Sequence, residues 1–238
     1  MFLLIDKPKG ITSHDVVDKI RKITGEKRIG HAGTLDPNAT GLLIVGVGRE
    51  STKKLGELSV NTKKKYIAEI YLGEERETDD VEGSQKQVRD SHIAKSVRDD
   101  KLGLDSLPDL SKVKIEEVIN SFVGEQEQVP PAYSAIKIKG KKAYELARRG
   151  KKVQLEPRKV TIHSIKLLSY RFPEVVIEAE VSSGTYIRAL ARDIGVKLGC
   201  GAYLKNLRRT QIGNFDITQA ISLDKLYKDN WEGFVIDY

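Results

Sequence analysis

The sequence has one cysteine, few aromatic residues and no long hydrophobic run. The single cysteine, Cys200, excludes an intramolecular disulfide and a zinc site built from several cysteines. The longest apolar stretches, such as residues 42–45, are far shorter than the roughly 20 residues of a membrane-spanning helix. The first five residues run directly into Asp6, without the basic leader or cleavage site of a signal peptide. These absences predict a cytoplasmic protein with no membrane segment.

Charge is abundant and unevenly distributed. The 238 residues are 39% hydrophobic and 32% charged, which is typical of a globular chain rather than a disordered one. The net charge is +7, but residues 137–159 alone contain ten basic and two acidic residues, so the rest of the chain is nearly neutral. A local excess of this size indicates a polyanionic partner at that segment.

Periodicity and turn residues predict a mixture of strands and helices. We expect strands at residues 3–5, 41–45, 65–72, 160–168, 175–181 and 207–215. We expect helices from Thr12 or Ser13 to Gly25, from Ser111 to Gly124, at 142–149, at 185–198 and near Leu223. Residues 30–37 are expected to form a loop, and residues 84–110 a polar surface insertion. Strands follow one another through loops at least as often as through helices, which favours an α+β fold with a largely antiparallel sheet.

Asp36 is the first candidate for a chemical role. Gly30 and Gly33 permit backbone conformations closed to other residues, and Pro37 moves Asp36 out of the helical region. The carboxylate is thereby presented on a stiff loop, a common placement for a catalytic group. The pattern alone favours a simpler interpretation, in which Asp36 caps a following helical turn and His31 is an incidental loop residue.

Arg188 and Tyr66 are two further candidates. Arg188 lies one turn inside the helix expected from Thr185, where a guanidinium could hold a carboxylate ionised and oriented. The alternative is a solvated surface arginine. Tyr66 follows three lysines, an arrangement that suits a nucleobase stacked on the ring with phosphates near the amines. The alternative is a tyrosine buried in the core of a strand.

Several motifs, taken in order, resemble those of the TruB-type tRNA pseudouridine synthases. They are LIDKPKGITS at 4–13, GHAGTLDPNATG at 30–41, KY at 65–66, PAYSAIK at 131–137, GKKAYE at 140–145, SGTYIR at 183–188 and LRRT at 207–210. The similarity extends from about residue 3 to residue 215. The joint order and spacing of the motifs make a chance match a poor explanation.

The resemblance implies a pseudouridine synthase fold, a bent and mainly antiparallel sheet flanked by helices, in one catalytic domain spanning 1–238. It implies isomerisation of a uridine in the T-arm of tRNA (position 55), without cofactor or metal and with no obligate protein partner. The catalytic residues carried over are Asp36 as nucleophile, Tyr66 and Arg188. The flipped-out uridine leaves a space that His31 fills, and Leu207 lines the pocket.

The resemblance also implies a mobile thumb at about residues 131–152 that folds over the RNA. Its basic residues Lys137, Lys141 and Lys142 are expected to bind substrate, as is Tyr186. Asp80 is carried over from a Thr-Asp-Thr-x-Asp run that the chain matches only in part. The RNA-binding PUA domain of the family does not fit in the 23 residues after Phe215. We therefore expect weaker tRNA binding than is usual in the family, and a monomer.

Three other functions remain open on the sequence. The chain could be a synthase that acts on another RNA or on several uridines. It could be an RNA-binding protein without catalytic activity, in which Asp36→Asn would leave the biological effect intact. A hydrolase built on His31 and Asp36 is the least favoured, because no nucleophile–base pair or second metal-ligand cluster accompanies them.

Overall fold

The computed structural model describes residues 1–60, 62–86, 109–134, 136–138, 140–149, 153 and 155–236. Most of the polar insertion expected at 84–110 and the end of the expected thumb (150–152) therefore lie outside the described residues. The chain divides into two compact units. The first contains Met1–Ile67, Glu180–Ser183 and Asn206–Tyr238, and the second contains Ala68–Ala179 and Gly184–Lys205.

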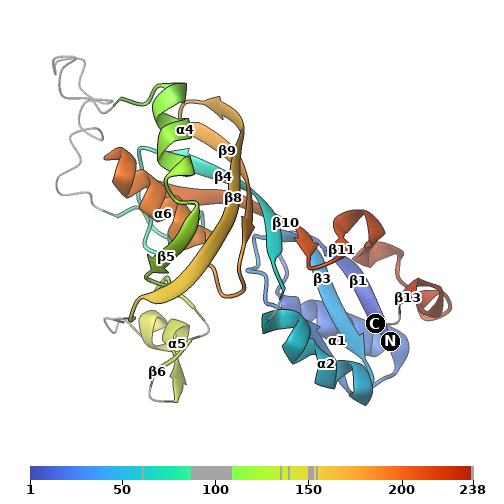
Figure 1. Ribbon diagram of the computed structural model, residues 1–238. Coiled ribbons are helices and arrows are strands. Elements are labelled where there is room, and N and C mark those ends of the chain that lie inside the picture. The colour runs from blue at the N-terminus through green and yellow to red at the C-terminus, as the bar shows by residue number, and fades with distance from the viewer. Residues whose placement is uncertain are drawn as a thin grey trace. The chain divides into compact units, whose positions relative to one another are not determined.

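The first unit is a sheet with helices on both faces. Its own elements are β1 (Phe2–Lys7), α1 (Ser13–Thr24), β2 (Ile29–Ala32), β3 (Thr40–Val47), α2 (Arg49–Val60), β11 (Phe215–Asp216), β12 (Ile221–Ser222) and β13 (Val235–Ile236). Strand β1 pairs antiparallel with β3 and with β13, so both ends of the chain meet in this sheet (Figure 1). Three strands contribute residues to both units: β4 (Lys64–Leu72), β9 (Glu174–Val181) and β10 (Ala202–Ile212).

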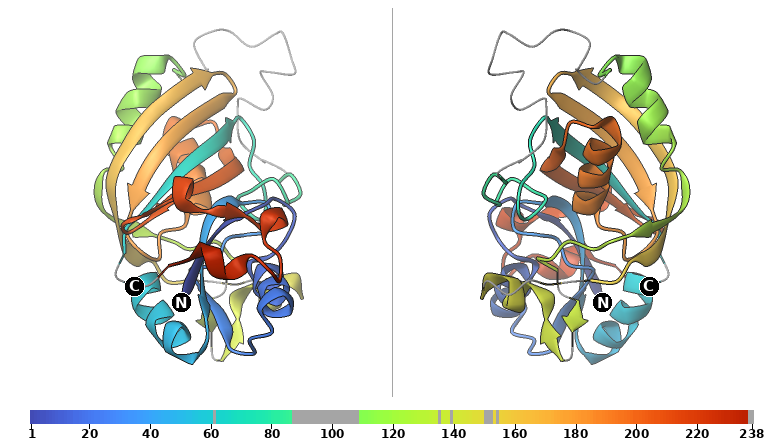
Figure 2. Two further views of the ribbon diagram at one scale, coloured as in Figure 1. Left: turned by 90° about the vertical axis from the view of Figure 1, so that its right-hand side faces the viewer. Right: turned by 90° about the vertical axis from the view of Figure 1, so that its left-hand side faces the viewer.

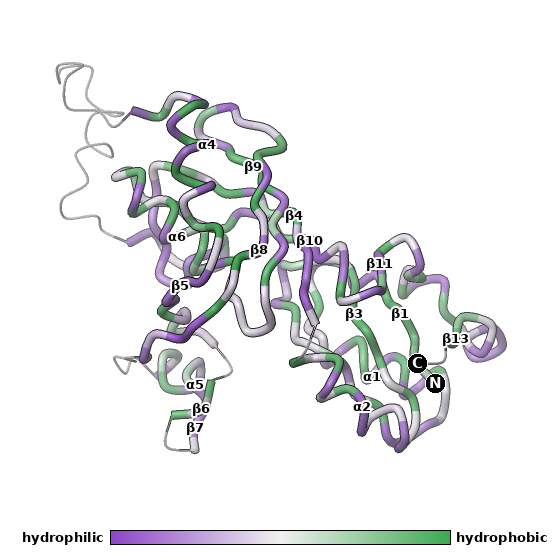
Figure 3. Tube along the Cα trace, in the orientation of Figure 1, coloured by the Kyte–Doolittle hydropathy of each residue, from purple (hydrophilic) through white to green (hydrophobic). Residues whose placement is uncertain are grey.

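Residues 2–5 of β1 and 42–45 of β3 are uninterrupted hydrophobic runs because both faces of these strands are buried there (Figure 3). Alternate residues belong to different clusters, as the two-residue period of a strand requires. Leu3 and Leu43 pack with α1, whereas Phe2 and Leu42 pack with α2. Figure 2 shows the two helices on opposite sides of these strands.

Helix α1 begins and ends where the sequence predicts. The Thr12 hydroxyl accepts a hydrogen bond from the Asp15 amide, and the Asp15 carboxylate accepts one from the Thr12 amide. This reciprocal capping satisfies amides that the first turn leaves without partners. Gly25 ends the helix in the left-handed conformation, with φ of 72°.

The second unit packs helices on an antiparallel sheet. Its own elements are α4 (Lys112–Asn120), β5 (Gly124–Gln128), β6 (Lys137–Ile138), β7 (Lys141–Lys142), α5 (Ala143–Arg148), β8 (Arg158–Arg171) and α6 (Ile187–Leu198). The strand order is β10-β4-β9-β8-β5, and β5 pairs antiparallel with β8. The α+β fold with a mixed, mainly antiparallel sheet is thus confirmed. No described helix is long and apolar enough to cross a membrane.

Two local predictions were wrong. Residues 30–32 belong to strand β2 rather than to a loop, because β2 completes the hydrogen bonds of one end of β3. Gly124 does not end a helix: α4 stops at Asn120, and Gly124 begins strand β5. The short helix expected near Leu223 is present as a 3-10 helix, Leu223–Lys225.

Candidate active site

Asp36 lies on the short segment between β2 and β3. The Leu35 amide donates a hydrogen bond to the Ser13 hydroxyl at 2.9 Å, and this hydroxyl donates to the Leu35 carbonyl at 3.0 Å. The Ala39 amide donates to the Asp36 carbonyl at 3.0 Å, which closes a turn that leads straight into β3. Residues 37–38 form this turn, and no helix begins after it. The segment instead holds its partly buried carboxylate on a backbone fixed from α1.

Lys7 supports the same segment from β1. Its side chain is fully buried, and Nζ donates to the carbonyls of Pro8 (2.9 Å), Ile11 (2.7 Å) and Pro37 (3.2 Å). Burial lowers the pKa of Lys7 to about 8, although the negative charge of Asp36 opposes this shift. A cation is thereby held near Asp36 by three backbone oxygens. A buried amine with that many acceptors is a structural support for the loop.

Arg209 fixes both ends of the Asp36 segment. Its side chain is 1% exposed, Nε donates to the Leu42 carbonyl at 2.7 Å, and Nη2 donates to the Gly33 carbonyl at 3.0 Å. The backbone of Arg209 pairs with Gly41 in the parallel β3–β10 ladder. Gly41 has φ of +103°, and a Cβ built there would lie 2.2 Å from the Arg209 carbonyl oxygen. Only glycine fits this approach of the two strands.

We therefore expect Gly41→Ala to lower the free energy of unfolding by at least about 3 kcal/mol, because it combines a strained φ with a backbone clash. Urea unfolding of the variant and the wild type measures this loss. The matched control is Gly56→Ala in α2, where a Cβ meets no atom within 4 Å. This control should be stabilised by about 0.5–1 kcal/mol through helix propensity. Equal stabilities of the two variants would contradict the role assigned to Gly41.

Leu207 lies on β10, the neighbour of β3, and Tyr66 lies on β4, the next strand of the sheet. The Thr40 hydroxyl, at the start of β3, donates to the Leu207 carbonyl at 3.4 Å. The Thr210 hydroxyl donates to the Lys65 carbonyl at 3.3 Å, which ties β10 to β4 next to Tyr66. Tyr66 is 8% exposed and lies on the buried face of β4, as the alternation of the strand predicts.

His31 lies on β2, opposite Val45 of β3. Burial lowers the pKa of His31, and the positive charges of Arg209 and His14 lower it further, so the ring is neutral at pH 7. Its buried Nδ1 has no hydrogen-bond partner among the described residues. The ring is therefore an uncharged planar group close to the Asp36 segment along the chain.

Arg188 is a candidate residue of the second unit. It lies in the first turn of α6 and is only 6% exposed, so the interpretation as a solvated surface arginine was wrong. Nη2 donates to the Tyr133 carbonyl at 3.0 Å, and Nη1 donates to the Thr78 carbonyl at 3.1 Å. Nη1 also lies 3.3 Å from Oδ2 of Asp80. The structure therefore brings Arg188 and Asp80, both predicted from the motifs, into one buried cluster.

Asp80 and Tyr186 are held by neighbouring groups of the same unit. Asp80 Oδ1 accepts hydrogen bonds from the Thr78 hydroxyl at 2.6 Å and from the Glu82 amide at 3.0 Å. Gln128, which is 4% exposed at the end of β5, accepts from the Tyr186 amide at 2.8 Å and donates to the Tyr186 carbonyl at 3.1 Å. This two-bond contact fixes the backbone just before α6.

The basic segment forms a hairpin followed by a short helix. Lys137 of β6 pairs with Lys142 of β7, and Ile138 pairs with Lys141. Helix α5 follows directly, with the Tyr144 amide donating to the Ser134 carbonyl at 3.0 Å. The side chains of Lys141 and Lys142 are exposed. Two of the predicted RNA-binding amines are thus available on one hairpin.

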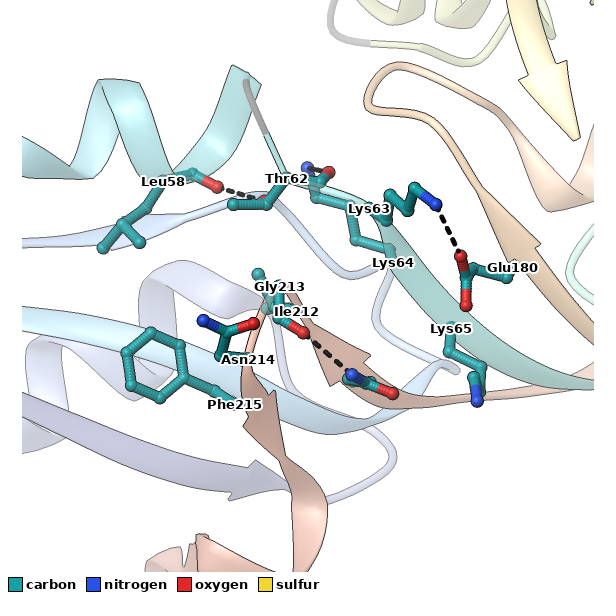
Figure 4. Close-up of a pocket in the computed structure, with 11 residues that line it drawn as sticks. Leu58, Thr62, Lys63, Lys64, Lys65, Glu180, Ile212, Gly213, Asn214 and Phe215 are labelled. Atoms are coloured by element: carbon teal, nitrogen blue, oxygen red, sulfur yellow. Dashed lines mark hydrogen bonds and ion pairs between the residues drawn. The ribbon is translucent and has the colours of Figure 1, made fainter. Parts of the chain in front are cut away.

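A cavity of about 370 Å³ in the first unit lies apart from these residues (Figure 4). Its lining is Leu58, Thr62, Lys63, Lys64, Lys65, Glu180, Gln211, Ile212, Gly213, Asn214 and Phe215. Lys63 is paired with Glu180 at 3.2 Å, and Lys64 donates to two backbone carbonyls. The cavity contains none of the site residues predicted in the first unit, so we do not assign it to the reaction. Among the described residues, no group of three or more acidic, histidine or cysteine side chains could hold a metal.

Four residues that support these candidate residues had no predicted catalytic or binding role: Lys7, Ser13, Gln128 and Arg209. Lys7 and Ser13 stand inside the first quoted motif, and Arg209 inside the last. The available signal was a lysine two positions after the apolar run of β1, where a buried charge must find acceptors. Gln128 had no such signal, because its partner is the backbone of Tyr186, 58 residues away.

Comparison with known proteins identifies the family. The family model for the N-terminal domain of TruB family pseudouridylate synthases matches residues 21–187, and the model for the tRNA pseudouridylate synthase B C-terminal domain matches residues 188–233. The tRNA pseudouridine synthase B of Thermosipho melanesiensis is 47% identical over 93% of this chain and 66% of its own length. That of Desulfotalea psychrophila is 44% identical over 98% of this chain and 90% of its own length.

A solved structure agrees with the sequence matches. A chain from an H/ACA RNP bound to a substrate RNA containing 2'-deoxyuridine superimposes with a TM-score of 0.67 and 28% identity, over 99% of this chain and 56% of that chain. This chain spans about two thirds of the length of the Thermosipho relative and nine tenths of the Desulfotalea relative. On the two family models, which together cover most of the sequence, the chain belongs to the TruB family of pseudouridylate synthases.

Proposed function

We propose that this protein isomerises a uridine in the T-arm of tRNA, at position 55, to pseudouridine without a cofactor. The Asp36 segment gives this proposal its strongest support. Asp36 lies in a motif that resembles the family's, the residue is partly buried, and Ser13, Lys7 and Arg209 bind the backbone of the segment. The curated relatives bear the name tRNA pseudouridine synthase B. Asp36 is the proposed nucleophile, and Tyr66 and Arg188 are the other proposed catalytic residues.

A uridine inside a folded T-arm has to leave its stack before a protein carboxylate can reach it. Flipping costs a few kcal/mol, which contacts to the extruded base and to the vacated space must offset. His31 is proposed to fill the vacated space, since its neutral ring can stack between bases without a desolvated charge. Leu207, Tyr186 and Asp80 are proposed to line or support the uracil site.

The basic hairpin is the proposed RNA clamp, with Lys137, Lys141 and Lys142 as its phosphate-binding residues. The extent of the synthase domain, residues 1–238, stays a prediction, and so does the monomer. A tRNA substrate and a single buried cysteine, Cys200, favour a cytoplasmic protein.

A tritium-release assay tests the proposal. Purified protein is incubated with an unmodified tRNA transcript tritiated at uracil carbon 5, in the presence of a chelator and without added cofactor. Isomerisation through that carbon releases the label, and a transcript with cytidine at position 55 should release none at that site. No release from any tRNA, with binding intact, would favour another RNA substrate or an RNA-binding protein without catalytic activity.

Charge reversal on the hairpin should flatten the salt dependence of tRNA binding. We expect the double variant Lys141→Glu/Lys142→Glu to lower the slope of log affinity against log salt by about 0.7–0.9 for each phosphate contact that is lost. Filter binding between 50 and 200 mM salt measures the slope. The control is Lys112→Glu/Lys114→Glu on α4, whose lysines are paired with Glu116 and Glu117. An unchanged slope in the hairpin variant would remove the clamp from the proposal.

A further inference from the structure

Helix α6 carries a second arginine one turn after Arg188. Arg192 lies four residues further on, so the two side chains share one face of the helix. Arg192 Nη1 lies 3.0 Å from Oδ2 of Asp79, and Nη2 donates to the Val129 carbonyl at 3.0 Å. The Asp79 side chain is 7% exposed and that of Arg192 is 20% exposed. Neighbouring aspartates, Asp79 and Asp80, are thus paired with successive arginines of one helix.

The backbone of Asp79 shows why this pairing matters. Asp79 has φ of 60°, the left-handed conformation, and among the described residues it is the one non-glycine residue with positive φ. Such a conformation costs of order 1–3 kcal/mol and persists where the surroundings hold it. Oδ2 of Asp79 meets Arg192, Oδ1 lies 3.6 Å from Lys86 Nζ, and the Asp79 carbonyl accepts from the Leu204 amide at 3.0 Å.

The turn at Asp79 directs both of its neighbours to one guanidinium. The Thr78 carbonyl and the Asp80 carboxylate lie 3.1 Å and 3.3 Å from the same nitrogen of Arg188, while the Asp79 side chain between them reaches Arg192. In an extended strand, by contrast, the side chains of residues 78 and 80 would share one face, but the carbonyl of residue 78 would point sideways, toward a neighbouring strand. The left-handed residue therefore creates the acceptor pair that holds Arg188.

Arg192 also acts on the second segment that contacts Arg188. The chain from Val129 to Tyr133 leaves the end of β5 and leads to the basic hairpin. Arg192 binds the carbonyl at its start and Arg188 the carbonyl of Tyr133. Both segments that contact Arg188 are thus anchored to α6 a second time through Arg192.

We propose that Arg192 and Asp79 are positioning residues for the isomerisation: their ion pair holds residues 78–80 and 129–133 so that Arg188 keeps its orientation. This inference rests on the proposed function, in which Arg188 is catalytic. Neither residue needs to touch the substrate. Loss of the pair should slow the chemical step and leave the affinity for tRNA unchanged.

Kinetics of four variants test the proposal. Arg192→Gln and Asp79→Asn are expected to lower the single-turnover rate by about tenfold to hundredfold, with KM unchanged, the loss typical of a misplaced catalytic group. The double variant should be no slower than the slower single variant, because each single change already breaks the Arg192–Asp79 pair. Asp79→Gly adopts the left-handed conformation freely but has no carboxylate, so it should be slow as well. A wild-type rate in Asp79→Gly or Arg192→Gln would overturn the inference.

The control is Lys197→Gln on the same helix, where the amine binds Ser121 and lies over the Phe122 ring. It should keep the wild-type rate, and a comparable loss there would mean that any damage to α6 has the same effect. Rescue by Arg192→Lys should be partial, since an ammonium cannot bind Asp79 and Val129 with the planar geometry of a guanidinium.

Amide hydrogen exchange tests the positioning role without catalysis. In the free protein, Arg192→Gln and Asp79→Asn should speed exchange of the amides in 76–83 and 129–134, and Lys197→Gln should not. Unchanged exchange in these two peptides would overturn the inference, whatever the protein does to uridine. Faster exchange together with an inactive wild type would instead refute the proposed function and keep the structural coupling.

Discussion

Replacing Asp36 with asparagine is expected to abolish pseudouridine formation while tRNA binding persists. Asparagine has the same shape as aspartate but cannot act as a carboxylate nucleophile, and loss of such a group lowers rates by about four orders of magnitude or more. The fold should survive, because the contacts that fix the segment reach its backbone. They are the Ser13 bonds to Leu35, the Lys7 bond to Pro37 and the Arg209 bond to Gly33.

Single-turnover tritium release and filter binding, made on the same preparation, measure this prediction. Thr34→Ala is the matched control, since Thr34 is an exposed residue of the same segment and should keep the wild-type rate. Release by Asp36→Asn at more than a few per cent of the wild-type rate would exclude Asp36 as the nucleophile. Loss of tRNA binding along with release would point to a folding defect, which circular dichroism would reveal.

The parts of the fold that could be predicted are those whose local sequence and tertiary environment agree. Helix α1 has a capping box at Thr12, a regular apolar spacing and a glycine stop, and it begins and ends as expected. Strand β4 alternates between buried and half-buried residues along its whole length. In both elements the buried residues are the apolar residues that recur at the spacing of a helix or of a strand.

The missed elements lack that agreement. Helix α2 buries only Ser51, Leu55 and Leu58 of its twelve residues, so its apolar stripe is too thin to be recognised. Strand β5, with the sequence GEQEQ, contains no apolar residue. It is the last strand of its sheet, where pairing with β8 satisfies the backbone and side chains can stay polar.

The candidate site divides in the same way. Asp36, Arg188 and Asp80 could be identified because they stand in motifs. Their supports could not, because the acceptors are mostly backbone carbonyls far away in the sequence, such as Thr78 and Tyr133 for Arg188. Every residue has a backbone carbonyl, so the sequence does not indicate which carbonyls accept these hydrogen bonds. The partners of a buried arginine become visible only when the fold brings them together.

Replacing Arg188 should produce the second large effect, on both rate and stability. Arg188→Lys keeps the charge but loses the fork that serves Thr78, Tyr133 and Asp80 together, and we expect the rate to fall about hundredfold. Arg188→Gln removes the charge and leaves the Asp80 carboxylate nearly buried without its cation. Breaking a buried pair in this way costs about 3–5 kcal/mol.

Urea unfolding separates the ion pair from general damage to α6. The double variant Arg188→Gln/Asp80→Asn should be more stable than Arg188→Gln alone, because the second change removes the uncompensated charge. The control pair is Arg208 with Asp6, whose two bonds of 3.1 Å and 2.7 Å join side chains that are 41% and 30% exposed. An exposed pair contributes about 0–1 kcal/mol, so Arg208→Gln should leave the unfolding midpoint almost unchanged. If Arg188→Gln also left the unfolding midpoint unchanged, the ion pair of Arg188 with Asp80 would not contribute to stability. The assignment of Arg188 as an oriented catalytic group would then lose its physical basis.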